Sequence, residues 1–227
     1  MKRFAALILC ACLLCVPSRA AQSEKLVALT FDDGPSGKYT RRLLDGLEER
    51  AVKATFLLCG YRMEQYPDLT QRIHREGHEI GLHGYSHKSM QYMCRREVAQ
   101  ELKESTALLP AGCSVAFLRP PGGLCGTCVE SAAADLGLAV LSWSVDPRDW
   151  ATRDTAAIER EVISHVQDGD VILLHDMSDS SVDAALKIID ELQEQGFRFV
   201  TASELARARN ITPEPGKVYK RFFQAAP

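Results

Sequence analysis

The sequence predicts a parallel α/β fold of the barrel-like kind, and two observations lead to this prediction. From residue 26 onward, seven short apolar runs alternate with segments whose apolar residues recur at helical spacing, which is the pattern of strand–helix units. Polar motifs follow several of these runs directly, and parallel α/β folds carry their sites at the carboxyl ends of strands. No long linker rich in Gly, Ser or Pro interrupts the alternation, so we expect one domain over residues 21–227.

The expected strands are short and apolar. The first is bounded by turn signals, and the sixth is apolar enough for both of its faces to be buried. We place the strands at 26–29, 54–58, 78–83, 115–118, 138–145, 170–175 and 197–200.

The expected helices are the amphipathic segments between these strands. Pro67 opens one of them and Gly77 closes it, as these residues usually do. Asp154 and Ser203 are available as N-caps of two others. The segment from Ile211 contains prolines and is expected to be loosely attached. We place the helices at 39–50, 67–76, 95–109, 129–136, 155–166, 182–195 and 204–209.

The N-terminus has the pattern of a secretory signal. Lys2 and Arg3 precede an apolar run over 4–16, and small residues follow it at Ser18 and Ala20. We expect residues 1–20 to be a signal peptide, which leaves a secreted or cell-wall protein. The run is too short to span a bilayer, so the mature chain should have no transmembrane span. The alternative is a lipoprotein, because residues 9–12 loosely resemble a lipid-attachment box.

Charge and composition limit the partners. The chain has 227 residues and a net charge of −3, and removal of residues 1–20 leaves 24 basic against 30 acidic residues. No basic cluster stands out, so nucleic acid is excluded as an expected partner. We expect a monomer.

Five cysteines remain after removal of the signal. Export permits disulfides, and the odd number leaves at least one thiol unpaired. The motif at 125–128 is a CxxC, but the second ligand pair of a zinc site and the thioredoxin-like context of a redox site are both missing. We therefore predict a local disulfide that involves Cys113, Cys125 or Cys128. The five are Cys59, Cys94, Cys113, Cys125 and Cys128.

Two adjacent carboxylates, Asp32 and Asp33, end the first expected strand, and Gly34-Pro35 forces a turn after them. Neighbours on an extended chain point in different directions. One carboxylate can therefore bind a metal while the other stays free as a base, with separated pKa values. An isolated motif of this kind is more often a solvated turn.

His83 and His87 lie four residues apart, just past the third strand. If the segment turns helically, both rings share one face. Together with Asp33 they would supply three ligands and leave open positions, the layout of a catalytic metal site. The alternative is a pair of polar histidines in a loop.

Three later motifs also end strands. Arg119 opens RPPGG, where it can pair with a carboxylate and where the Gly122 amide can donate to an oxyanion. In DPRDW, Asp149 offers a partner for Arg119 or another charged group, and Trp150 offers an apolar wall. His175 ends the sixth strand and can act as a general acid. Alone, the first motif is as readily a rigid turn with a surface arginine, and the alternative for the second is an ordinary loop with a core tryptophan. For His175 alone, a satisfied core histidine is the more common case.

The ordered set TFDDGPS, HGYSH, RPPGG, DPRDW and ILLHD resembles the polysaccharide deacetylases of the NodB-homology type, carbohydrate esterase family four. The resemblance covers roughly residues 25–220. It implies a distorted (β/α) barrel of about seven parallel strands and a divalent metal, with Zn²⁺ as the first choice and Co²⁺ as the alternative. It further implies metal ligands Asp33, His83 and His87, a catalytic set of Asp32 (base), His175 (acid), Arg119 and Asp149, and a pocket lined by Gly122, Trp150 and Leu173.

Two positions depart from the family pattern. Gly122 stands where the family usually has Tyr, and Gly84 stands where Thr or Ser is more common. A backbone oxyanion donor survives the first change, but the lost ring alters the groove. Both changes bear on substrate fit more than on the chemistry.

The resemblance implies a metal-dependent N-deacetylase that releases acetate from glycans containing N-acetylglucosamine, and the N-terminal signal pattern implies that the enzyme is exported. Peptidoglycan is the first expected substrate and chitooligosaccharide the second. One alternative is an O-acetyl esterase acting on xylan, because the same site cleaves esters. Another is a catalytically weak glycan-binding protein of the cell surface, which the change at Gly122 motivates.

Overall fold

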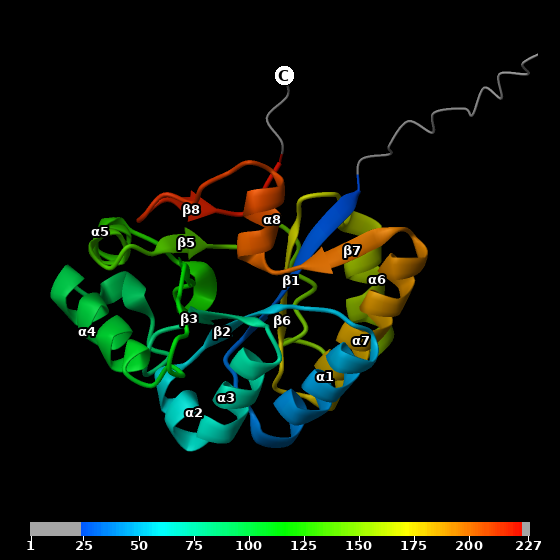
Figure 1. Ribbon diagram of the computed structural model, residues 1–227, viewed down its shortest axis with the longest axis horizontal. Helices are drawn as coiled ribbons and strands as arrows, with labels where there is room; N and C mark the ends of the chain where they lie inside the picture. Colours follow the sequence, from blue (N-terminus) through cyan, green and yellow to red (C-terminus); the bar gives the residue numbers. More distant parts are fainter. Residues whose placement is uncertain (1–23, 224–227) are drawn as a thin grey trace, which may run out of the picture.

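The computed structural model describes residues 24–223 and confirms the parallel α/β fold (Figure 1). All pairings between the named strands of this region are parallel. The strands are β1 (Lys25–Asp32), β2 (Thr55–Leu58), β3 (Glu79–Leu82), β4 (Phe117–Leu118), β5 (Ala139–Leu141), β6 (Val171–His175), β7 (Phe197–Val200) and β8 (Val218–Tyr219).

The sheet curls into a distorted barrel around β1. Its order is β6-β1-β2-β3-β4-β5-β8, and β7 pairs with the first half of β1. Past β5 the chain returns to β6, where Val145 forms a parallel bridge with Ile172. The amide of Leu173 donates to the Val145 carbonyl at 2.9 Å. This narrow contact closes the barrel, which the sequence pattern alone did not establish.

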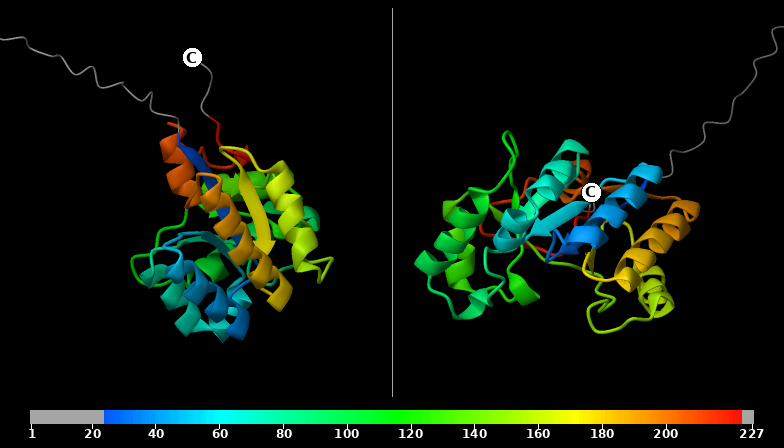
Figure 2. Two further views of the ribbon diagram at one scale, coloured as in Figure 1. Left: turned by 90° about the vertical axis from the view of Figure 1, so that its right-hand side faces the viewer. Right: turned by 90° about the horizontal axis from the view of Figure 1, so that it is seen from below.

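Helices α1 to α7 cover the outer side of the sheet, whereas α8 packs against the inward-facing Leu26 and Ala28 of β1 (Figures 1 and 2). α6 packs on α7 at one side of the barrel, and α4 packs on α5 at the other. The helices are α1 (Gly37–Glu49), α2 (Gly60–Gln65), α3 (Pro67–Arg75), α4 (Arg95–Thr106), α5 (Thr127–Asp135), α6 (Thr155–His165), α7 (Asp179–Glu194) and α8 (Ala202–Ala208), with 3₁₀ turns η1 (Met90–Tyr92) and η2 (Pro121–Gly123).

The alternation of β1 explains how the barrel carries a site at one end. Val27, Leu29 and Phe31 point outward into the main apolar cluster under α1, α6 and α7. The inward positions change along the strand, from apolar Leu26 and Ala28 to polar Thr30 and Asp32. Since successive side chains of a strand face opposite sides, the lower barrel is filled with apolar groups and the carboxyl end is polar.

Two local expectations needed correction. α2 was not predicted, because six residues are too few to show helical periodicity. The N-cap of α8 is Thr201 and not Ser203. Thr201 Oγ1 accepts from the Glu204 amide at 3.2 Å, and the Glu204 carboxylate accepts from the Thr201 amide at 2.9 Å, which is a capping box. Asp154 caps α6 as expected, accepting from the Ala157 amide.

The expectation that the segment from Ile211 is loosely attached is wrong. β8 adds to the sheet beside β5. Beyond it, Phe222 is fully buried in the inner apolar cluster, and its ring stacks on Tyr219 at 5.4 Å. Burial of two aromatic rings outweighs the weak local propensity of a Pro-containing segment.

The predictions of a signal peptide and of a lipid-attachment box fall on residues 1–20, outside the described residues. Within 24–223, no helix is both long enough and apolar enough to cross a bilayer.

Candidate active site and metal centre

A cavity of about 390 Å³ opens at the carboxyl ends of the strands. Eight of the ten predicted site residues line it, and the other two, Arg119 and Asp149, are buried directly behind it. The lining residues are Asp32, Asp33, His83, His87, Gly122, Trp143, Asp146, Trp150, Leu173 and His175.

The turn after β1 brings Asp33 into this cavity, and Asp33 has a left-handed φ of 72°. Asp176 holds the turn from below: its carboxylate accepts from the Thr40 hydroxyl, and its carbonyl accepts from the Ser36 hydroxyl. A Cβ at Gly34 would lie 2.6 Å from Asp176 Oδ1, so only glycine fits there. We did not predict a role for Asp176, and its position next to His175 was the one available signal.

Asp33, His83 and His87 form a compact donor set. Asp33 Oδ1 lies 3.2 Å from His83 Nε2 and 2.9 Å from His87 Nε2, and the three ligand atoms lie within 4.8 Å of one another. His83 Nδ1 donates to the Arg119 carbonyl at 2.7 Å, which leaves Nε2 of the neutral ring without a proton and facing Asp33. Asp33 Oδ1 is buried without a hydrogen-bond donor. One carboxylate and two imidazole nitrogens suit a divalent transition metal, so the residues fit such an ion.

The electrostatics of this set agree with a cation site. Burial alone would raise the pKa of Asp33, but hydrogen bonds and charge from the two imidazoles in their protonated form outweigh burial and hold the pKa below its usual range. The contact with Asp33 in turn raises the pKa of His87, while burial opposes the rise. A carboxylate that stays ionised at every working pH is a suitable metal ligand.

Asp32 has a different partner. Its Oδ1 accepts from Nη1 of Arg119 at 2.6 Å. The guanidinium also donates to the Thr30 hydroxyl and to the carbonyls of Leu141 and Ser142, each at 2.9 Å. These four bonds engage all three nitrogens of the guanidinium. The second oxygen of Asp32 accepts no hydrogen bond from the described residues and lies 3.8 Å from His83 Nε2 at the cavity. The two neighbouring carboxylates are therefore held in separate environments, as the sequence suggested.

His175 and Asp149 form the second ion pair of the site. Asp149, which is fully buried, accepts from His175 Nδ1 at 2.7 Å and from the His175 amide at 2.9 Å. Burial by itself lowers the pKa of His175, but Asp149, aided by the charges of Asp32 and Asp33, raises it to about 9. The sequence left the partner of Asp149 open between Arg119 and another charged group, and the structure pairs Asp149 with His175.

The pocket wall is open at the position of the family departure. Gly122 has a φ of 71°, and a Cβ built there would meet no atom within 4 Å. Trp150 is 58% exposed, with the Arg148 guanidinium stacked 5.3 Å from its ring centroid. Leu173 is buried in the cavity floor.

Trp143 and Asp146 also line the cavity and were not predicted as site residues. We expected a strand over 138–145, but β5 ends at Leu141, and the chain beyond it turns Trp143 inward. A Cβ at Gly123 would lie 2.3 Å from the Trp143 ring, so glycine at this position makes room for the indole. Asp146 is the first residue of the DPRDW motif and could have been predicted from it. Trp143 lies outside all five motifs, so nothing in the sequence pointed to it.

The predicted disulfide is wrong: Cys59, Cys94, Cys113, Cys125 and Cys128 are all free. Cys113 packs against the main apolar cluster, whereas Cys125 packs against the separate cluster under α4 and α5. Cys128 lies in the exposed first turn of α5.

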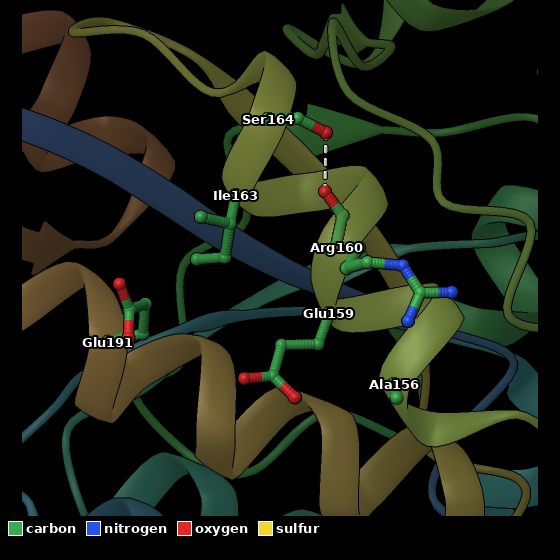
Figure 3. Close-up of a pocket in the computed structure, with 6 residues that line it drawn as sticks. All are labelled: Ala156, Glu159, Arg160, Ile163, Ser164 and Glu191. Carbon is green, nitrogen blue, oxygen red and sulfur yellow. Dashed lines mark hydrogen bonds between the residues drawn. The ribbon is translucent and has the colours of Figure 1, made fainter.

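A second hollow, of about 410 Å³, lies between α6 and α7 (Figure 3). None of the predicted site residues lines it. Its wall consists of Ala156, Glu159, Arg160, Ile163, Ser164 and Glu191. The chemistry-bearing groups thus gather at the carboxyl end of the barrel.

Fold and site define an enzyme of the parallel α/β barrel class with a candidate metal centre at the carboxyl ends of its strands. A sequence model described as polysaccharide deacetylase matches residues 19–141. The chain is 36% identical over 194 residues to a peptidoglycan-N-acetylglucosamine deacetylase of Bacillus cereus, covering 83% of this chain and 91% of that protein. It is 34% identical over 195 residues to a chitooligosaccharide deacetylase of Sinorhizobium fredii, and the match covers 79% of this chain and 91% of that protein.

Among solved structures, a family 4 acetyl xylan esterase from Clostridium thermocellum, in complex with a cobalt ion, superposes with a TM-score of 0.81 at 32% identity, over 87% of this chain and 98% of that one. The chain spans 40% of the length of several longer peptidoglycan deacetylases. The chain belongs to the polysaccharide deacetylase family, the NodB-homology type of carbohydrate esterase family four, whose deacetylases are metal-dependent hydrolases acting on carbon–nitrogen bonds.

Proposed function

We propose that this protein is an exported N-deacetylase that releases acetate from glycans containing N-acetylglucosamine, with peptidoglycan as the first substrate and chitooligosaccharide as the second. The observation that carries the proposal is the placement of Asp32 and His175 in the same cavity as the Asp33–His83–His87 set. Each has its own charged partner, so one can act as a base and the other as an acid.

A divalent metal held by Asp33, His83 and His87, Zn²⁺ first and Co²⁺ as the alternative, supplies polarisation of the acetyl carbonyl and a lowered pKa for water. Asp32 takes the proton of the attacking water, with Arg119 holding its other oxygen. The Gly122 amide donates to the carbonyl oxygen as its negative charge develops.

His175 then gives its Nε2 proton to the departing amine, because Nδ1 is engaged by Asp149. This donation follows attack, because the amide nitrogen becomes basic only once the carbonyl carbon is tetrahedral. It must come before or during cleavage of the C–N bond, since a glycan amine leaves only when it is protonated. Leu173 and Trp150 line the space for the acetyl methyl group. Export and action at the cell wall fit the peptidoglycan and chitooligosaccharide deacetylases to which the chain is similar.

An O-acetyl esterase is the second candidate, and the similarity to an acetyl xylan esterase favours it. Ester and amide hydrolysis need the same base and oxyanion donor. They differ in the leaving group: an alcohol depends less on protonation by His175 than an amine does.

The decisive experiment is acetate release by residues 21–227 from peptidoglycan, chitopentaose and acetylxylan, with and without a chelator. We expect chelator-sensitive acetate from the first two. Asp32→Asn should bind metal without turnover, and His83→Ala should lose the metal. Full activity in Asp32→Asn would overturn the mechanism. Glycan binding without acetate from any substrate, by metal-loaded protein, would favour the glycan-binding alternative.

A further inference from the structure

The loop that carries His83 and His87 is held from two neighbouring helices. From α2, the amides of Gly60 and Tyr61 donate to the carbonyls of Gly84 and Tyr85 at 2.9 and 3.0 Å. These bonds satisfy the carbonyl side of the loop. Its amide side faces α4, which packs against α2.

On that side, the carboxylate of Glu101 uses both of its oxygens on the loop. Oε2 accepts from the amides of Tyr85 and Ser86, both at 2.8 Å, and Oε1 accepts from the Ser86 hydroxyl at 2.8 Å. Among the described residues, no Lys, Arg or His forms an ion pair with Glu101. The carboxylate is therefore committed to the loop, through charge-assisted bonds to main-chain amides.

The loop needs this restraint because of its backbone. His87 follows Ser86 directly and has a φ of 58°, a conformation that residues other than glycine adopt only when the surroundings impose it. Gly84 has a φ of 77° and no side chain with which to fix the loop. A Cβ there would lie 2.8 Å from Met90 Cε, so a larger residue does not fit without a shift.

We propose that Glu101 is a positioning residue of the metal centre, which holds the Tyr85–Ser86 main chain so that His87 faces Asp33 and His83. The inference rests on the metal site of the proposed function. Residues that orient ligands in this way typically change metal affinity about 10- to 100-fold when they are removed.

The test measures metal binding in the absence of substrate. Zn²⁺ affinity is measured by competition with a chromophoric chelator, and the site geometry is measured from the Co²⁺ absorption spectrum. We expect Glu101→Ala to weaken binding about 10- to 100-fold and to alter the spectrum. Glu101→Gln should stay near the wild type, because its amide oxygen can accept from both amides while its NH₂ donates to the Ser86 hydroxyl.

The control is Glu104→Ala, which removes the same charge from the same helix at a residue bonded to Gln100 and not to the loop. Should Glu101→Ala fail to fold, Glu101→Asp is the second variant: it keeps the charge but is too short to reach both amides, and weaker binding is expected. If Glu101→Ala, or Glu101→Asp where Glu101→Ala does not fold, keeps the wild-type affinity and spectrum, the role of Glu101 is overturned and the metal site of the proposed function stands. A wild-type protein that binds no metal would overturn the metal site and this inference together.

Discussion

Nη1 of Arg119 lies 2.6 Å from Oδ1 of Asp32, and neither side chain is more than 4% exposed. A buried ion pair stabilises a protein only where its remaining donors are satisfied. Arg119 meets this condition through Thr30 and two main-chain carbonyls. The guanidinium of Arg119 is thereby held in place and fixes the position of Asp32, which is the proposed base.

Arg119→Lys should keep the positive charge but lose the planar guanidinium and its fixed set of N–H donors. We expect kcat to fall about 100-fold, the lower end of the range for general acid–base catalysis, because Asp32 is displaced and not removed, while the metal stays bound. The free energy of unfolding should fall by about 1–3 kcal/mol, because carbonyls of the barrel interior lose their donors. Urea unfolding and kcat of the metal-loaded protein measure the two effects. Arg198→Lys, at an exposed arginine of β7 that pairs with Glu24, is the control. An Arg119→Lys protein that behaves like this control would refute the role of Arg119.

Asp149→Asn should lower the pKa of His175. Asp149 is the main group that raises this pKa to about 9 against the effect of burial, and loss of such a partner shifts a pKa by about 1–3 units. Because the proposed acid must be protonated, the basic limb of the kcat profile should move to lower pH by that amount. Both proteins are loaded with the same metal, so the difference between their kcat–pH profiles reports the effect of Asp149 on His175.

A stability measurement checks the same pair. A raised histidine pKa contributes stability that is present below the unfolded value of about 6.5 and is lost as pH rises through about 9. In Asp149→Asn, this decline between pH 6.5 and 9 should shrink in proportion to the fall in the pKa of His175. An unchanged basic limb together with an unchanged decline would show that Asp149 does not control His175.

The main parts of the site were predictable because parallel strands place their carboxyl ends at one edge. Asp32 pairs in register with His175 of β6, and His83 follows β3, two strands away on the other side. The partner of Asp149 was not predictable. Either Arg119 or His175 satisfied the chemistry, and the choice depends on how the chain after β5 meets β6.

The parts that sequence reasoning missed depend on long-range packing. Phe222 anchors the C-terminal segment only because an apolar surface inside the barrel receives it. Trp143 lies in the cavity because β5 ends early, and a propensity pattern does not set strand length to within a few residues. Glu101 is one of several glutamates on an amphipathic helix, and only tertiary structure distinguishes it.

His78 should make the protein sensitive to mild acid. Its ring is buried, accepts from the Ala54 amide through Nδ1 at 3.2 Å and lies edge-on to Phe56. Burial lowers its pKa to about 4, with smaller contributions from Lys53 and Arg72. The unfolded chain binds a proton below about pH 6.5 and the folded chain does not, so stability falls as pH drops from 6.5 to 4, by up to about 3 kcal/mol.

His78→Asn should remove this loss, because the Asn amide oxygen takes the place of Nδ1 and does not titrate. Urea unfolding at pH 4.5 and 6.5 gives the two free energies. His165→Asn, at an exposed histidine of α6, should leave the difference between them intact. Equal pH dependence in wild type and His78→Asn would contradict the assignment.

The cysteines should react as free thiols in an order set by exposure. Cys94 and Cys128 are exposed, whereas Cys59 is buried and burial raises its pKa. Burial also raises the pKa of Cys113, and that of Cys125 to about 11. Because the thiolate is the reactive form, a disulfide reagent should label two thiols quickly in native residues 21–227 and all five in denaturant.

Two variants assign the fast thiols. Cys128→Ser should remove one of the two, and Cys59→Ser should leave the native count unchanged while lowering the denatured count by one. Fewer than five thiols in denaturant would mean that a disulfide forms. If denatured Cys128→Ser then shows two reactive thiols fewer than its four cysteines, the disulfide does not lie in the CxxC at 125–128, because a bridge there requires Cys128.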